Sequence, residues 1–202
     1  MARIPFDQRF PEHVAALRAA YAEAHRAYHN WGHIEALLAD FRRLEDRFAN
    51  PEAVEMALYW HDAVYDPTSK TNEADSAERM LSEMRGRVAP EVLRWAETIV
   101  RATVNHRVPD DAGPELAADC ALFLDMDLAI LGAAPEAFDA YDAAIRQEYA
   151  AIPDLLYLPG RKTIMAGFLK RERLYLTDTF HRTHDAPARA NLRRLIGRLT
   201  LS

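Results

Sequence analysis

Apolar residues recur at the spacing of an α-helix through nearly the whole sequence. Ile34, Leu37, Leu38, Phe41 and Leu44 follow the i, i+3, i+4, i+7 pattern that gives a helix one buried face. The composition agrees, because 36 residues are alanine, the best helix former, and only 7 are glycine. We therefore expect an all-α fold of about eight or nine helices, and we exclude β-sandwiches and collagen-like repeats.

Capping and turn signals divide this pattern into separate helices. Asn50-Pro51 indicates the start of a helix, because Asn caps an N-terminus well and Pro suits the first turn. That helix becomes apolar nearly all round, which is typical of a helix at the centre of a fold. Residues 153–161 are expected to form a loop, and no linker or repeat interrupts the chain, so we expect a single domain over residues 1–202. The expected helices open after Pro11, span about 34–48, open at Pro51, and then span 72–85, 90–104, 116–131, 135–149, 163–169 and 185–199.

Charge and the apolar content exclude several classes of partner. The net charge of −6 repels phosphate backbones, so we expect no binding to nucleic acid, although a local metal or Arg cluster can still attract a small phosphorylated molecule. Residues 1–7 carry no apolar run like that of a signal peptide, and no stretch of about 18 apolar residues predicts a membrane span. Cys120 is the single cysteine, which fits a cytoplasmic protein and a residue of the core. The oligomeric state stays open.

Two segments carry the side chains that bind metals. In the segment 28–33, YHNWGH, His29 and His33 stand four residues apart, and an adjacent His61-Asp62 pair ends the very apolar helix. Imidazole nitrogens together with a carboxylate oxygen suit a divalent transition metal. A buried Asp is costly unless it is paired with a cation or hydrogen-bonded. The two segments therefore predict a metal site.

A third candidate ligand lies in an apolar run later in the chain. Asp125 and Asp127 interrupt FLDMDLAIL, which would otherwise form a fully buried helix. On a helix the two carboxylates point about 200° apart, so only one of them faces any given site. Each could also serve as a buried hydrogen-bonding group, a role that the pattern favours for Asp125.

The order of these residues resembles that of the HD-domain superfamily of metal-dependent phosphohydrolases. In this superfamily a His, an adjacent His-Asp pair and a distant Asp come from separate helices of an all-α fold and hold a divalent metal. The resemblance implies that the metal ligands are His33, His61, Asp62 and Asp127. From about Tyr21 to Arg194, the chain looks like a small bacterial branch of predicted HD phosphohydrolases.

Two segments extend the resemblance to catalytic roles. The YHNxxH segment is similar to that of cyclic nucleotide phosphodiesterases, which implies that His29 is the general acid. The segment 61–66, HDAVYD, is similar to a segment of stringent-response nucleotide hydrolases in which His-Asp is followed by Glu-Asp. Tyr65 stands where the Glu would be, so only the role of Asp66, as a carboxylate that orients water, is carried over.

The expected activity is hydrolysis of a phosphate ester or phosphoanhydride bond in a small molecule, with nucleotides as the first class to consider. A divalent metal would activate the water, and Asp66 or Glu73 would orient it. The metal could be manganese, cobalt, nickel, iron, zinc or magnesium. Candidate residues for binding the substrate are Arg26, His106, Arg146, Arg161 and Lys162. Arg161 and Lys162 follow Gly160 at an expected helix start, where backbone N–H groups favour anions.

Two other functions remain open. Some HD-fold proteins hold two irons and activate O₂, which would require Asp62 as a bridge and His106 in the ligand shell. A non-catalytic nucleotide sensor could keep the same fold without turnover. A second His-Asp pair, His184-Asp185, lies in a polar stretch, where Asp185 is expected to cap the last helix and not to bind metal.

Overall fold

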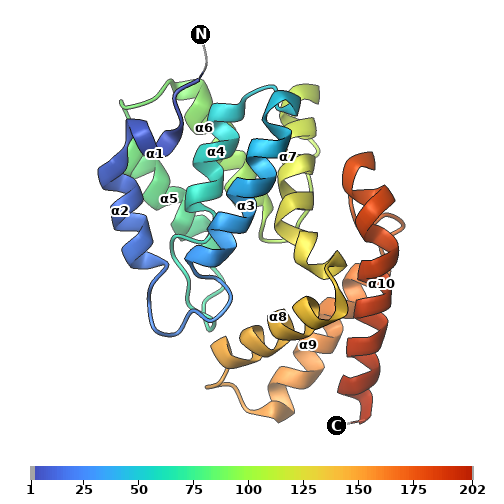
Figure 1. Cartoon of the computed structure of the whole chain (residues 1–202). Helices are drawn as coiled ribbons and strands as arrows, with labels where there is room; N and C mark the ends of the chain where they lie inside the picture. Colours follow the sequence, from blue (N-terminus) through green and yellow to red (C-terminus); the bar gives the residue numbers. More distant parts are fainter. Residues whose placement is uncertain (1–2, 202) are drawn as a thin grey trace. The chain divides into compact units, whose positions relative to one another are not determined.

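The computed structural model describes the backbone of residues 3–201 and the side chains of residues 3–200, so Met1 and Ala2 of the N-terminal segment lie outside the described residues. Within this part of the chain there are ten α-helices and two short 3₁₀ helices, with no strand (Figure 1). The all-α fold expected from the apolar spacing is confirmed. The helices group into two compact units, one ending at Leu124 and one beginning at Asp125. Between residues 3 and 201, no helix has both the length and the apolar character needed to cross a membrane.

The first unit contains six complete helices and most of a seventh. They are α1 (Phe6–Arg9), α2 (Pro11–Ala20), α3 (Trp31–Leu44), α4 (Pro51–Trp60), α5 (Asn72–Met84), α6 (Pro90–Ala102) and α7 (Pro114–Asp127), with a 3₁₀ helix at Glu45–Arg47. The single cysteine, Cys120, lies on α7 and is fully buried, and burial raises the pKa of its thiol to about 12. It is therefore a residue of the core, as expected, and not a reactive thiol.

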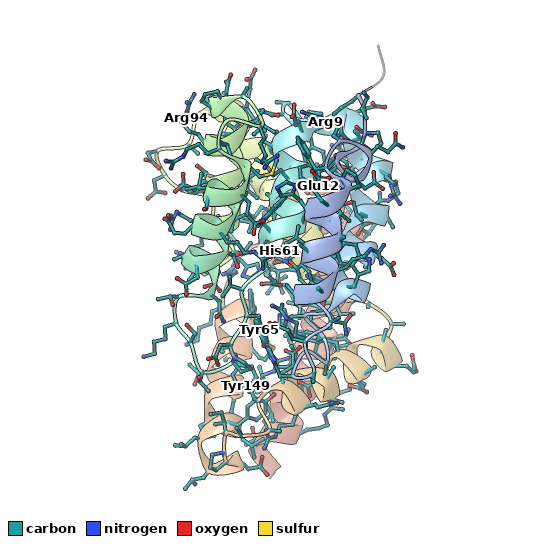
Figure 2. All side chains as sticks on the ribbon, turned by 90° about the vertical axis from the view of Figure 1, so that its left-hand side faces the viewer. Arg9, Glu12, His61, Tyr65, Arg94 and Tyr149 are labelled. Atoms are coloured by element: carbon teal, nitrogen blue, oxygen red, sulfur yellow. The ribbon has the colours of Figure 1, made fainter. Side chains whose placement is uncertain are left out.

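Helix α4 forms the centre of the first unit. Every residue from Ala53 to Trp60 is buried, and the helix packs against α3, α5 and α6. Its start is fixed by Asn50, whose Oδ1 accepts from the Ala53 N–H at 3.1 Å, as the Asn-Pro signal predicts. Because the helix is enclosed on all sides, His61 at its C-terminal end is buried within this unit (Figure 2).

The second unit contains the helices from the end of α7 onward. They are a 3₁₀ helix at Leu128–Gly132, α8 (Pro135–Glu148), α9 (Asp154–Leu169) and α10 (Asp178–Leu201). The 3₁₀ helix lies very close to α10. A Cβ added at Gly132 would lie 2.8 Å from the Cβ of His184 and 2.9 Å from its carbonyl oxygen, so only glycine fits there without a shift. Asn191 of α10 completes this contact by donating to the carbonyls of Leu131 and Ala133, both at 2.9 Å.

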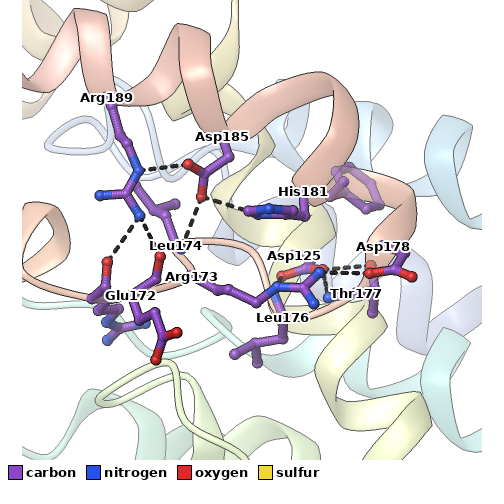
Figure 3. Close-up of polar contacts among 12 residues, drawn as sticks. Asp125, Glu172, Arg173, Leu174, Leu176, Thr177, Asp178, His181, Asp185 and Arg189 are labelled. Atoms are coloured by element: carbon purple, nitrogen blue, oxygen red, sulfur yellow. Dashed lines mark hydrogen bonds and ion pairs between the residues drawn. The ribbon is translucent and has the colours of Figure 1, made fainter.

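Two buried carboxylates hold the segment that joins α9 to α10 (Figure 3). Asp125 accepts from the Leu176 N–H and the Thr177 N–H, both at 2.7 Å, and from the Thr177 hydroxyl at 2.6 Å. Asp185 accepts from the Leu174 N–H at 3.0 Å and from Arg189 Nε at 2.5 Å. Both oxygens of Asp125 are thus used in this connection, which is the hydrogen-bonding role that the sequence favoured for it.

The expected loop over residues 153–161 is wrong, because α9 begins at Asp154 and continues through Pro159. A proline inside a helix leaves one carbonyl without its N–H partner, and here that carbonyl belongs to Leu155, a residue that is 85% exposed. Arg161 and Lys162 consequently lie in the interior of α9. The expected helix start at these two residues, with backbone N–H groups free to bind an anion, is wrong for the same reason.

The expected start of the last helix at Asp185 is also wrong, because α10 begins at Asp178 and includes Pro187. Asp185 lies in the interior of the helix and does not cap it. Its carboxylate is instead occupied by Arg189, four residues later on the same helix, and by the Leu174 N–H, which lies before the helix.

Candidate metal centre

The side chains of the candidate metal site lie at two helix ends of the first unit. His33 lies in the first turn of α3, whose N-cap Asn30 accepts from the Gly32 N–H at 2.8 Å and donates from its amide to the Ala27 carbonyl at 2.8 Å. His61 is the C-cap residue of α4, and Asp62 follows directly. The capping of α3 and the apolar character of α4 therefore determine where the two imidazoles lie.

The ligand atoms of these three residues converge. His33 Nε2 lies 3.2 Å from His61 Nε2, and His61 Nε2 lies 3.0 Å from Asp62 Oδ2. One ligand atom from each residue falls within 4.8 Å of the other two, which makes this a group able to hold a metal ion. His33 and His61 are buried, and the Asp62 side chain is 16% exposed, so the cluster is closed on most sides.

The partner of the other imidazole nitrogen sets the tautomer of His61. Its Nδ1 lies 3.0 Å from the Leu58 carbonyl, which can only accept, so we assign the proton to Nδ1. The Nε2 lone pair then points toward His33 and Asp62. A nitrogen lone pair beside a carboxylate oxygen favours binding of a cation between them. In metal sites the other ring nitrogen of a ligating His often donates to a backbone carbonyl, as His61 Nδ1 does here.

The spacing of these atoms fits a transition metal ion. Metal–ligand bonds of about 2.1 Å place neighbouring ligand atoms about 3.0 Å apart in octahedral geometry and about 3.4 Å apart in tetrahedral geometry. The separations of 3.0 and 3.2 Å fall in this range. Three protein ligands also leave further coordination positions for water or substrate, as in catalytic metal sites.

His29 and two aromatic side chains lie beside the metal-binding cluster. The His29 ring centroid is 6.3 Å from that of His33 and 4.4 Å from that of Tyr65, and the Tyr28 ring is 5.0 Å from His33. His29 lies in the loop before α3 and is half-buried, and it is not among the three grouped ligands. This position is compatible with the predicted role of a proton donor.

The two predicted water-orienting carboxylates lie farther along the chain in the first unit. Asp66 is exposed, and its Oδ1 accepts from the N–H and the hydroxyl of Thr68, both at 2.8 Å, which lowers the pKa of the Asp66 carboxyl. One of its oxygens is thus occupied in a local turn. Glu73 is half-buried in the first turn of α5. The structure brings neither residue into the group of three ligands.

Two of the predicted substrate-binding residues, Arg26 and His106, lie in the first unit. The side chain of Arg26 is fully buried, with an ion pair to Glu23 at 2.9 Å. His106 lies in the loop after α6, half-buried, with a φ of 50°, in the left-handed region that non-glycine residues rarely adopt. Arg26 therefore does not present its guanidinium to solvent, where a substrate phosphate would meet it.

The remaining predicted residues belong to the second unit. Arg146 donates to the carbonyl of Tyr149 at 2.7 Å and pairs with Asp154 at 2.7 Å, so it joins the end of α8 to the start of α9. Arg161 is buried and pairs with Asp142 of α8 at 3.1 Å. The other two are Asp127, the last residue of α7, and Lys162, which is half-buried on α9.

Two residues around the cluster were missed by the sequence reasoning as parts of the site. The Tyr21 hydroxyl donates to the Tyr59 carbonyl and accepts from the Asp62 N–H, both at 3.2 Å. It therefore fixes the backbone at Asp62. Tyr65, noted only as a departure from a family pattern, packs against His29. Tyr21 gave no signal because it reads as one more apolar residue of the first helix.

A comparison of the chain with family models, with curated proteins and with solved structures finds no match.

Proposed function

We propose that the protein is a metal-dependent hydrolase of phosphate ester or phosphoanhydride bonds in a small molecule, with nucleotides as the first substrate class to test. The observation that supports a metal site is that one ligand atom each from His33, His61 and Asp62 lies within 4.8 Å of the other two. The resemblance of the segments 28–33 and 61–66 to HD-domain phosphohydrolases supports the phosphoryl substrate. The proposal rests on the first unit, and the role of Asp127 as a fourth ligand stays a prediction.

The donor set indicates which ions to consider. Two imidazole nitrogens with one carboxylate oxygen suit manganese, iron, cobalt, nickel and zinc better than calcium, which prefers oxygen ligands alone. When bound, such an ion lowers the pKa of a coordinated water and polarises a phosphoryl oxygen. The chain carries a net charge of −6, so this local positive charge would offset the general repulsion of a phosphorylated substrate.

The side chains around the cluster have complementary roles in this proposal. His33, His61 and Asp62 would hold the ion, and the Leu58 carbonyl would keep the His61 Nε2 lone pair directed at it. His29 would donate a proton to the leaving oxygen, because imidazole is the side chain that most often serves as a general acid. The Tyr65 ring, whose centroid is 4.4 Å from that of His29, would limit the orientations that His29 can take.

The Asp62→Asn variant tests the proposal most simply. Purified protein is supplied with Mn²⁺ and incubated with a panel of nucleoside mono-, di- and triphosphates and phosphate monoesters, and released phosphate and pyrophosphate are measured. We expect release by the wild type and its loss in Asp62→Asn, because the substitution replaces a charged ligand by a neutral one. Asp46→Asn, an exposed carboxylate of the same unit, is the matched control and should keep full activity.

Three results would contradict the proposal. The first is a wild-type protein that holds Mn²⁺ but releases nothing from any member of the panel. The second is equal release by wild type and Asp62→Asn. The third is release that persists after the metal has been removed with a chelator.

The cytoplasmic location expected from the sequence is also part of the proposal. Its support is the single, buried cysteine, which is free in the structure.

A further inference from the structure

The metal-binding cluster is assembled from two separate stretches of the first unit. One is the loop and helix start that carries His29 and His33, and the other is the chain end of α4 that carries His61 and Asp62. The ligand atoms converge only if these two stretches keep a fixed distance and orientation. A group that joins the backbones of the two stretches would fix this distance.

The guanidinium of Arg26 bridges the two stretches at the residues that carry the ligands, whereas His25 Nε2 of the same loop contacts the backbone farther along, at the Tyr65 carbonyl. Arg26 Nη1 donates to the His29 carbonyl at 3.2 Å and to the Asp62 carbonyl at 2.7 Å, and Nη2 donates to the Ala63 carbonyl at 3.4 Å. One carbonyl belongs to the first stretch and two belong to the second. Arg79 also donates to the Ala63 carbonyl, at 3.1 Å, but it reaches only the second stretch.

The surroundings of Arg26 hold the guanidinium in this position. Its side chain is fully buried, and its Nε pairs with Glu23 at 2.9 Å. The rings of Tyr21 and Tyr65 lie 5.0 Å and 5.4 Å from the guanidinium carbon, within the range of cation–π contacts. A buried charge is stable only when it is paired and hydrogen-bonded, so the bridge has few alternative arrangements.

We propose that Arg26 is a positioning residue of the metal centre, acting through the backbone of His29 and Asp62 and not on the substrate. This inference rests on the proposed metal site. It replaces the expectation that Arg26 binds a substrate phosphate, because its donors face carbonyl oxygens inside the unit. Mutation of residues that lie outside the ligand shell but fix its geometry commonly weakens metal binding by about 10–100-fold.

The geometry also explains why arginine is required. The planar guanidinium presents donors in several fixed directions, and here three carbonyl oxygens and one carboxylate use them. A lysine ammonium has the same charge but presents its three donors from one nitrogen. Arg26→Lys therefore keeps the charge and loses part of the bridge, whereas Arg26→Met keeps only the apolar stem.

The test uses Co²⁺ alone as the probe, added to metal-free protein. The dissociation constant and the visible absorption band of bound Co²⁺ are measured for the wild type, Arg26→Lys and Arg26→Met. The control is Arg101→Met, which removes an arginine that pairs with Glu78 and Glu97 on the surface of the same unit. Circular dichroism melting shows whether each variant is folded.

We expect Arg26→Met to bind Co²⁺ about 10–100-fold more weakly with an altered absorption band, Arg26→Lys to lie between it and the wild type, and Arg101→Met to match the wild type. If the Met variant does not fold, the Lys variant decides. Wild-type affinity and an unchanged band in the folded Arg26 variants would overturn the inference, and the metal site would stand. A wild-type protein that binds no Co²⁺ would instead contradict the proposed function itself.

Discussion

Replacing Asp185 by Asn should destabilise the second unit at neutral pH. The Asp185 carboxylate accepts from Arg189 Nε and from the Leu174 N–H, and its side chain is only 12% exposed (Figure 3). Asn keeps one acceptor oxygen for Leu174 but loses the charged partner of Arg189. Hydrogen bonds to charged groups contribute about 1.5–3 kcal/mol, so we expect a loss of this size in the free energy of unfolding at pH 7.

The loss should depend on pH with a definite sign. Burial by itself would raise the pKa of Asp185. The hydrogen bonds from Arg189 and Leu174 outweigh this effect, so the pKa of Asp185 is lowered in the folded protein. A carboxyl with a lowered pKa stabilises the fold above its unfolded pKa of about 3.9 and loses this contribution as the pH falls through the folded value. The difference between wild type and Asp185→Asn should therefore be full at pH 7 and shrink below about pH 4.

Urea unfolding followed by circular dichroism at pH 7, 4 and 3 measures this difference. The control is Asp178→Asn, which removes a carboxylate from the same helix that also pairs with arginine but is 65% exposed. Water screens that pair, so the control should lose much less stability. An Asp185→Asn loss no greater than that of the control at pH 7, or one that stays constant down to pH 3, would show that the ionised Asp185 carboxylate does not stabilise the second unit.

Three further outcomes are expected. Gly132→Ala should cost about 1–3 kcal/mol in thermal or urea unfolding, because its Cβ would lie 2.8 Å from the His184 Cβ, whereas Gly197→Ala, with open space around it, should be neutral or slightly stabilising. His29→Ala should retain bound metal by elemental analysis but lose about 10²–10⁴-fold in turnover, and loss of the metal would make His29 a ligand. A chelator should lower the melting temperature of metal-loaded wild type and leave Asp62→Ala unchanged, since only a protein that binds the ion is stabilised by it.

The sequence predicted the helices best where local signals and burial agree. Asn50-Pro51 begins α4, and the apolar run that follows is buried throughout, as an enclosed helix requires. It failed at α9, where Pro159 was interpreted as part of a loop, although a single missing N–H near an exposed turn is tolerated. It failed again at Asp185, whose partner Leu174 lies in a different segment.

In the candidate site, too, some residues could be predicted from the sequence and others could not. His33, His61 and Asp62 could be found from residue type and order, and the structure brings their ligand atoms together. The roles of Tyr21 and Arg26 could not be found, because both act on backbone carbonyl and N–H groups, which every residue has. Such partners are chosen by packing in three dimensions and leave no spacing pattern in the sequence.

Metal binding and phosphate release, measured on the same samples, test the proposed metal centre most directly. Metal-free wild type and Asp62→Ala are titrated with Mn²⁺, and bound metal and released phosphate are followed together with the nucleotide panel as substrate. We expect release by the wild type to rise in proportion to bound metal, and both signals to be absent from Asp62→Ala. Release at zero bound metal, or an Asp62→Ala variant that keeps both, would contradict a catalytic metal centre at His33, His61 and Asp62.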